Sequence, residues 1–215
     1  MNIFLPYNQK YILNTYGFDT EHASFIEEIV LQNLLKRLTK NKLISRVDVY
    51  TQDNKFISRT NSKKLNFIKS PSNEFETSEK IIQDYLSIQK LTEPFVYYNL
   101  MFPFTMISKI HNALQTVNQG IYESATGVID KGVVWSRVSS KDTNPSDHTL
   151  SQKEIDTVLD VGSFCIIKPE NILKGLRRTT QPILLVPLAS HELINMRSKS
   201  DKDLYQLLIT SGMDL

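Results

Sequence analysis

The sequence VGSFCII at 161–167 opens the stretch that decides the fold, which continues to Leu208. This unbroken apolar run predicts a buried strand. Pro169 suits the first position of a helix, so we expect a short helix over 169–173. A second apolar run at 182–187 predicts another strand.

The last part of this stretch predicts a capped helix over 200–208. Ser200 stands three residues before Asp203, which is the spacing of a capping box. Three leucines follow at helical spacing. Strand, helix, strand and helix in this order indicate an α/β protein.

The rest of the chain repeats the alternation of strand and helix. Strands are predicted at 2–6, 47–51, 95–99, 124–129 and 133–138, and helices at about 20–40, 78–89 and 105–117. Asp19 or Thr20 caps the first of these helices. The short connections favour βαβ units, and hence an α/β fold with a mostly parallel (mixed) sheet and helices on both faces.

One polar segment interrupts this pattern. Residues 139–151 are rich in Ser, Thr, Asp, Asn and Pro, and such a segment is either a mobile surface loop or an arm that reaches a neighbouring subunit. With 215 residues, the chain suits a single domain over 1–215, with this loop or dimerisation arm at about 136–152.

The composition excludes several classes of function. Lys and Arg total 25 against 23 Asp and Glu, a net charge of +2, which is too balanced for a nucleic-acid footprint. No apolar stretch is long enough to cross a membrane, and we find no secretory signal pattern. The single cysteine, Cys165, excludes internal disulfides and indicates a reduced, cytoplasmic protein with a buried, inert thiol.

The segments after two predicted strands are candidates for ligand binding. Asp53 follows the strand 47–51, and ligands bind outside the carboxyl ends of parallel strands, although Asp is also a common turn residue there. The loop 7–19, after the first strand, has one glycine, Gly17. This loop can therefore bring fewer backbone amides against a phosphate than a Gly-rich loop can.

Several segments, taken in order along the chain, carry a resemblance to a known family. They are LISRVDVYTQD at 43–53, FVYYNLMFPF at 95–104, ESATGV at 123–128, SQ at 151–152, VGSFC at 161–165 and SDKDL at 200–204. These segments resemble motifs of the acylneuraminate cytidylyltransferases, the CMP-sialic acid synthetases, within the nucleotide-diphospho-sugar transferase superfamily. The resemblance covers nearly the whole chain.

The resemblance implies a Rossmann-like nucleotide-diphospho-sugar transferase fold and a homodimer. It also implies an attack by a hydroxyl of a sugar acid on the α-phosphate of CTP, with release of pyrophosphate and with help from Mg²⁺. Such a reaction needs donors and cations around the triphosphate, and carboxylates to hold the metal.

Carried onto this sequence, the resemblance and the positions at strand ends assign residues to each part of that reaction. The catalytic candidates are Lys10 and Asp53; the nucleotide candidates are Pro6, Asn8, Lys69, Asn99, Arg197 and Lys199; the sugar candidates are Gln152, Gly162 and Ser163; and the metal candidates are Asp201 and Asp203. The alternative for Asp201 and Asp203 is the acidic first turn of the last helix.

This chain departs from the family's pattern in two places. After Pro6 the first loop lacks the family's arginine and glycine, which leaves Lys10 as the nearby cation. Where the family has two metal-binding aspartates, this chain has Arg197 and Lys199. These two cations either meet phosphate oxygens directly in place of a metal or belong to a solvated turn.

Three functions are therefore open. The first is a nucleotidyltransferase that activates a sugar acid with CMP. The second is a catalytically degenerate member of the family that binds a nucleotide or a partner in surface-glycan synthesis. The third, a glycosyltransferase-like protein, is disfavoured because such enzymes commonly hold their metal with a mid-chain Asp-x-Asp, and the single such pair here, Asp201 with Asp203, lies late in the chain.

Overall fold

The computed structural model describes residues 1–8, 19–52, 62–71, 77–131 and 157–211. The strands are β1 (Asn2–Pro6), β2 (Arg46–Thr51), β3 (Leu65–Lys69), β4 (Phe95–Tyr98), β5 (Ser124–Lys131), β6 (Thr157–Ile167) and β7 (Ile183–Pro187). The helices are α2 (Thr20–Phe25), α3 (Gln32–Lys40), α4 (Ser78–Gln89), α5 (Ile107–Asn118), α6 (Pro169–Leu173) and α7 (Lys199–Thr210). A π-helical segment η1 (Ile26–Leu31) joins α2 to α3, and a 3₁₀ turn η3 (Ser190–Leu193) follows β7.

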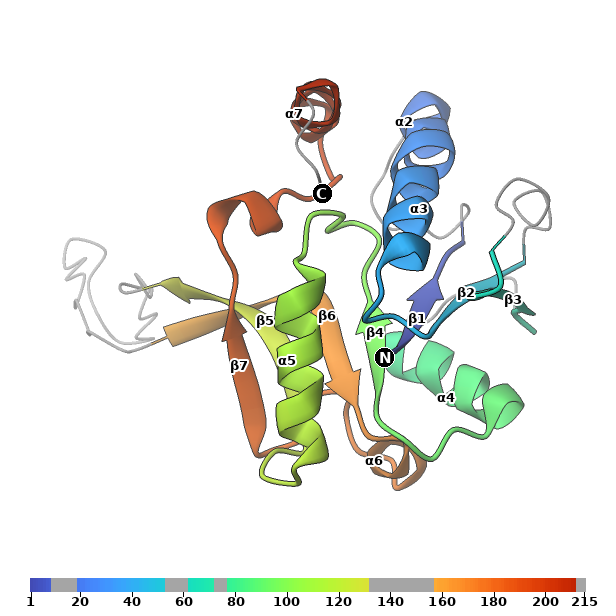
Figure 1. Cartoon of the computed structure of the whole chain (residues 1–215), viewed down its shortest axis with the longest axis vertical. Coiled ribbons are helices and arrows are strands. Elements are labelled where there is room, and N and C mark those ends of the chain that lie inside the picture. The colour runs from blue at the N-terminus through green and yellow to red at the C-terminus, as the bar shows by residue number, and fades with distance from the viewer. Residues whose placement is uncertain (9–18, 53–61, 72–76, 132–156, 212–215) are drawn as a thin grey trace, which may run out of the picture.

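The strands form one seven-stranded sheet in the order β3-β2-β1-β4-β6-β5-β7, as Figure 1 shows. Every pairing is parallel except the two that β6 makes with β4 and β5. The predicted α/β fold with a mostly parallel, mixed sheet is confirmed. Among the described residues, no helix has both the length and the apolar character that a membrane crossing requires.

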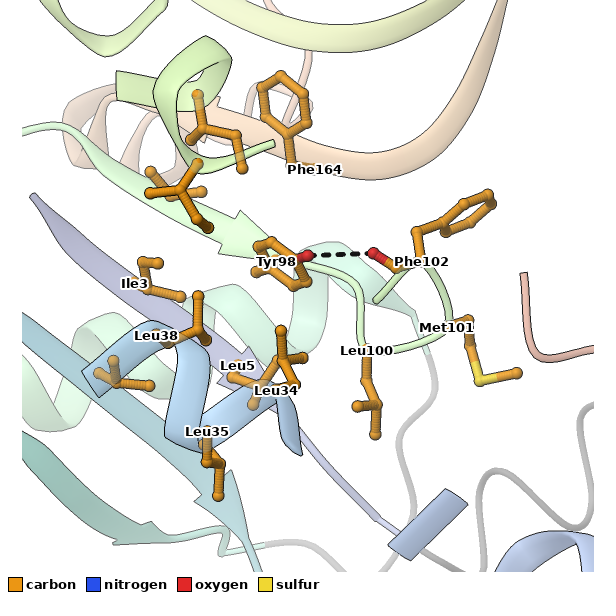
Figure 2. Packing of buried hydrophobic residues seen from close by; sticks show 14 of the residues in the cluster. Ile3, Leu5, Leu34, Leu35, Leu38, Tyr98, Leu100, Met101, Phe102 and Phe164 are labelled. Atoms are coloured by element: carbon orange, nitrogen blue, oxygen red, sulfur yellow. Dashed lines mark hydrogen bonds between the residues drawn. The ribbon is translucent and has the colours of Figure 1, made fainter. Parts of the chain in front are cut away.

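Alternate residues of the central strands supply two cores, one on each face of the sheet. Ile3 and Leu5 of β1 pack with leucines of α3 and with apolar residues of α5. Figure 2 shows Leu34, Leu35 and Leu38 in this cluster, together with Tyr98 of β4. Helices on both faces are thus a consequence of the period of two in buried strands.

The opposite face is covered by α4 and α6. Phe4 of β1 points to this side and stacks on Tyr85 of α4, with ring centroids 3.9 Å apart and an interplanar angle of 18°. Ile172 of α6 belongs to the same cluster. Thr77 caps α4, since its side chain accepts a hydrogen bond from the backbone N–H of Lys80.

A buried carboxylate in β2 ties α4 to the sheet. Asp48 is 1% exposed, and its Oδ1 accepts hydrogen bonds from Arg46 Nε at 2.6 Å and Asn66 Nδ2 at 2.8 Å. Its Oδ2 accepts one from the Tyr85 hydroxyl at 2.6 Å. Burial, and then the hydrogen bond to Asp48, raise the pKa of Tyr85 above its ordinary value, so the phenol stays protonated and donates.

Two element predictions need correction, and two others stay open. The strand predicted from 161 begins at Thr157, because β6 pairs with β5 over its whole length. The last helix is capped by Ser198 with Asp201 and not by Ser200 with Asp203, so it begins earlier than predicted. The predicted strand 133–138 and the arm at about 136–152 lie outside the described residues.

Replacing Tyr85 by Phe should lower the free energy of unfolding by about 1–3 kcal/mol, because it leaves a buried oxygen of Asp48 without a donor. Urea denaturation followed by circular dichroism measures the change. The matched control is Tyr122→Phe, because Tyr122 is half-buried and its hydroxyl has no hydrogen-bond partner among the described residues. Equal effects of the two substitutions would contradict this role for Asp48.

Candidate functional site

A cavity of about 280 Å³ lies where the order of strands reverses. The chain adds β2 and β3 on one side of β1 and then places β4 on the other side. A crevice outside the carboxyl ends of β1 and β4 is the expected place for a ligand in such a sheet. The residues that line the cavity are Pro6, Asn8, Ser78, Ile81, Tyr97, Asn99, Leu100, Met101, Asp160, Val161, Gly162, Arg178 and Arg197.

The loop after β4 lines this cavity and is held by hydrogen bonds within itself and to its neighbours. The Asn99 side chain donates to the carbonyl of Gly162 at 2.9 Å and accepts from the backbone N–H of Met101 at 3.0 Å. The Tyr98 hydroxyl donates to the carbonyl of Phe102 at 3.0 Å, the bond drawn in Figure 2, and accepts from Arg37. Asn99 therefore links β4 to β6 with both ends of its amide engaged.

The antiparallel direction of β6 brings its amino-terminal half to the same edge of the sheet. Gly162 adopts a φ of +67°, a backbone conformation that glycine tolerates best, and a register shift between Thr126 and Val128 of β5 lies opposite. Asp160 Oδ1 accepts from the Gly162 N–H at 2.8 Å and from the Thr126 hydroxyl at 2.9 Å. Gly162, a sugar candidate from the sequence, therefore lies at an irregularity inside the strand.

Arg197 enters the cavity next to an anchored residue. Met196 is fully buried, its N–H donates to the carbonyl of Met101 at 2.9 Å, and its carbonyl lies 3.0 Å from Nε2 of His22 in α2. Because both backbone groups of Met196 are held, the position of the Arg197 backbone is fixed by the fold.

Arg178 is the second arginine of the cavity, and it is not among the residues predicted from the sequence. It lies between α6 and β7, and its Cζ is 6.0 Å from the ring centroid of Tyr97, at the outer limit of a cation–π contact. Its neighbour Arg177 is exposed. No local pattern distinguishes these two arginines, because the packing of the loop onto β4 decides which one lines the cavity.

The structure brings together some of the residues predicted for the site. The cavity described above is lined by five of them: Pro6, Asn8, Asn99, Gly162 and Arg197. Lys69 is exposed at the end of β3, two strands away from β1. Lys10, Asp53, Gln152 and the side chain of Lys199 lie outside the described part of the chain.

Ser163 is buried in β6, beside β5, and does not line the cavity. Its carbonyl accepts a hydrogen bond from the Asn99 N–H at 2.9 Å, while its hydroxyl has no partner among the described residues. A Cβ added to Gly127 would lie 2.5 Å from this hydroxyl oxygen and 2.9 Å from Leu188 Cδ1. Gly127 therefore allows β5 to approach Ser163 closely.

The described residues do not fit a resident Mg²⁺ site. They contain no group of three His, Cys, Asp or Glu that could hold a metal. Asp201 Oδ2 accepts hydrogen bonds from the N–H and hydroxyl of Ser198, and neither Asp201 nor Asp203 lines the cavity. Asp160, the carboxylate in the described cavity wall, already accepts two hydrogen bonds.

Cys165 lies in the sheet behind the cavity. It is fully buried, and burial raises the pKa of its thiol to about 11. The inert thiol predicted from the sequence agrees with this environment.

Similarity to known proteins was found at the level of structure. No family model and no curated protein matches the sequence. The 2-C-methyl-D-erythritol 4-phosphate cytidylyltransferase of Francisella tularensis is similar with a TM-score of 0.64 and 12% identity, over 96% of this chain and 99% of that one. The enzyme of the same name from Thermus thermophilus has a TM-score of 0.60 and 12% identity, over 97% and 98%.

A third similar structure is the molybdopterin-guanine dinucleotide biosynthesis protein A of Archaeoglobus fulgidus, with a TM-score of 0.55 and 10% identity, over 98% and 100% of the two chains. At such low identity the likeness shows the fold. The Rossmann-like α/β fold that the sequence resemblance implied is therefore confirmed, because the chain shares it with these structures over nearly its whole length.

Changing Gly127 to Ala should destabilise the protein by about 1–3 kcal/mol, because the new methyl group overpacks the contact with Ser163. Changing Ser163 to Ala should cost close to nothing, because it removes a buried hydroxyl that has no partner among the described residues. In the double mutant the cost of Gly127→Ala should fall, and urea denaturation of all four proteins measures this coupling.

The control for the serine is Ser124→Ala, since the buried Ser124 hydroxyl donates to the carbonyl of Thr180 at 2.8 Å and accepts from its N–H at 3.0 Å. This change should cost about 1 kcal/mol. Additive effects at Gly127 and Ser163 would show that the two residues do not press on one another. A loss of ligand affinity in Ser163→Ala would instead support the sugar-binding role predicted for it.

Proposed function

We propose that this protein is a nucleotidyltransferase that transfers CMP from CTP to a sialic-acid-like sugar acid. The observation that carries the proposal is the cavity at the carboxyl ends of β1 and β4, which Asn8, Asn99 and two arginines line. The fold supports it, because two of the similar structures bear the name of a cytidylyltransferase. The choice of a sugar acid rests on the sequence resemblance.

In this reaction a hydroxyl oxygen of the sugar acid forms a bond to the α-phosphorus of CTP. The bond from that phosphorus to the oxygen bridging to the β-phosphate breaks, pyrophosphate leaves with the electron pair, and the hydroxyl proton passes to solvent. Negative charge shifts onto the leaving group, and a fixed cation lowers the cost of that shift. Arg197, whose backbone is fixed through Met196, is the cavity residue that we assign to this task.

Mg²⁺ enters the proposal as the ion that accompanies the triphosphate in solution, since the described residues do not form a site for it. Arg197, and Lys199 and Lys10 as predicted from the sequence, would supply positive charge from the protein. The second function, a catalytically degenerate subunit, shares this nucleotide site and differs in the absence of turnover.

We also propose that the protein is a cytoplasmic homodimer. Val158 and Leu159 at the start of β6 are 43% and 49% exposed, on the part of β6 that pairs with β5 from Val128 to Lys131. Apolar side chains in that position suit contact with a second copy of the chain. The reduced cysteine, Cys165, suits the cytoplasm.

Incubation with CTP, Mg²⁺ and a panel of sialic-acid-like sugar acids should release pyrophosphate in equal amount to a CMP-sugar product. Arg197→Gln should lower kcat/KM by about 100-fold, because a fixed charge next to the phosphates is lost. Arg177→Gln, which changes an exposed arginine outside the cavity wall, should leave kcat/KM unchanged. Binding of CTP without product from any acceptor would favour the degenerate subunit that binds a nucleotide. No binding of any of the four common triphosphates would exclude the nucleotidyltransferase and favour a degenerate subunit that binds a protein partner.

Replacing both Val158 and Leu159 by Asp should turn a dimer into a monomer. Their side chains point to opposite faces of β6, so the double change places a charge in the contact whichever face the second copy covers. Sedimentation equilibrium of the wild type and the variant measures the mass. A control variant, Leu173→Asp, alters a side chain that is 71% exposed on α6 and should keep the dimer. A monomeric wild type would contradict the proposal.

A further inference from the structure

His22 of α2 donates a buried hydrogen bond to the segment that carries Arg197. The side chain is 8% exposed, and its Nε2 lies 3.0 Å from the carbonyl oxygen of Met196. Because a carbonyl oxygen can only accept, Nε2 carries a hydrogen and donates it. His22 does not line the cavity, but the residue that it holds directly precedes Arg197 of the cavity wall.

This contact acts on the direction in which the chain enters Arg197. The Met196 carbonyl and the Arg197 N–H belong to one planar peptide group. The segment between η3 and α7 forms neither helix nor strand, so no regular ladder of backbone hydrogen bonds orients this group. On the other side of the group, the Arg197 N–H donates to Asn195 Oδ1 at 3.2 Å in an exposed contact. His22 therefore orients the peptide group from the protein interior.

Both the backbone and the ring of His22 are themselves held in place. Asp19 caps α2, since its Oδ1 accepts a hydrogen bond from the His22 N–H at 2.7 Å. The imidazole lies edge-on to the ring of Phe25, with centroids 6.5 Å apart and an interplanar angle of 66°. A donor that is placed in both ways can hold the Met196 carbonyl in one direction.

Other contacts hold α7 against α2 and do not involve His22. Figure 1 shows both helices at the same end of the molecule. Tyr205 of α7 is buried and packs at right angles to Phe25 of α2, with ring centroids 5.9 Å apart. Lys202 of α7 pairs with Glu21 at 2.7 Å and lies over the Phe25 ring. Loss of the His22 donor should therefore free the Met196 peptide group without releasing α7.

We propose that His22 is a positioning residue, which holds Arg197 where it meets the phosphates of a nucleotide. This inference rests on the proposed function, because it takes CTP as the ligand. An arginine on a mobile backbone would lose more conformational entropy when it binds a phosphate than an arginine on a fixed one. His22 thus raises the affinity for phosphate without touching the ligand.

The test is calorimetric titration of the whole protein with CTP and with inorganic tripolyphosphate. His22→Leu removes the donor, and it should weaken the binding of both ligands by about 10-fold, because a charge that is no longer held in place binds less tightly. His22→Gln keeps an N–H donor on a side chain of similar length, and both affinities should stay within about 3-fold of the wild type.

A double mutant distinguishes positioning from a general effect on the fold. In the Arg197→Gln background, His22→Leu should change either affinity by less than about 2-fold, because its effect passes through Arg197. The control is Ser124→Ala, which removes a buried hydroxyl that donates to the carbonyl of Thr180. It should lower the urea midpoint and leave both affinities unchanged.

Wild-type affinities in His22→Leu would overturn the inference and leave the proposed function intact. An equal loss with and without Arg197 would also overturn it, because His22 would then act by stabilising the fold. If the wild type binds neither CTP nor tripolyphosphate, the proposed function is refuted, and the inference falls with it because Arg197 then meets no phosphate.

Discussion

The position of β1 between β2 and β4 is the constraint on which the rest of the structure depends. The chain adds strands outward to β3 and then returns to the other side of β1, so the connections after β1 and β4 diverge to opposite sides. No single side chain creates the resulting crevice. The crevice follows from the strand order. That order is compatible with apolar strands buried on both sides, because helices cover both faces of the sheet.

The walls of the crevice are held by contacts that differ in kind from those of the cores. Apolar packing fixes the sheet and the helices, with Phe4 stacked on Tyr85 on one face and the leucines of α3 on the other. The cavity itself is shaped by short polar links, namely Asn99 to Gly162 and Met196 to Met101. Such links fix direction as well as distance, which a site for an oriented ligand requires.

The fold was largely predictable from the sequence, and the site was predictable only in part. Periodicity alone marks buried strands such as VGSFCII at 161–167 and helices such as α5, because their burial is regular. The half-buried strand β3 gives a weak signal, and two serines two residues apart compete for one helix cap. Arg178 could not be predicted, because nothing in the local sequence separates it from Arg177. The two differ only in the folded protein, where Arg178 is half-buried next to Tyr97 and Arg177 is exposed.

The order of the cavity residues along the chain has a consequence for synthesis. β1 and β4 are complete by residue 98, but both arginines of the cavity wall come after residue 177. β6 inserts between β4 and β5, so the edge of β4 stays open until the ribosome has released most of the chain. A nascent chain halted before that point carries an uncovered strand edge, which makes it a client for chaperones before it can bind any ligand.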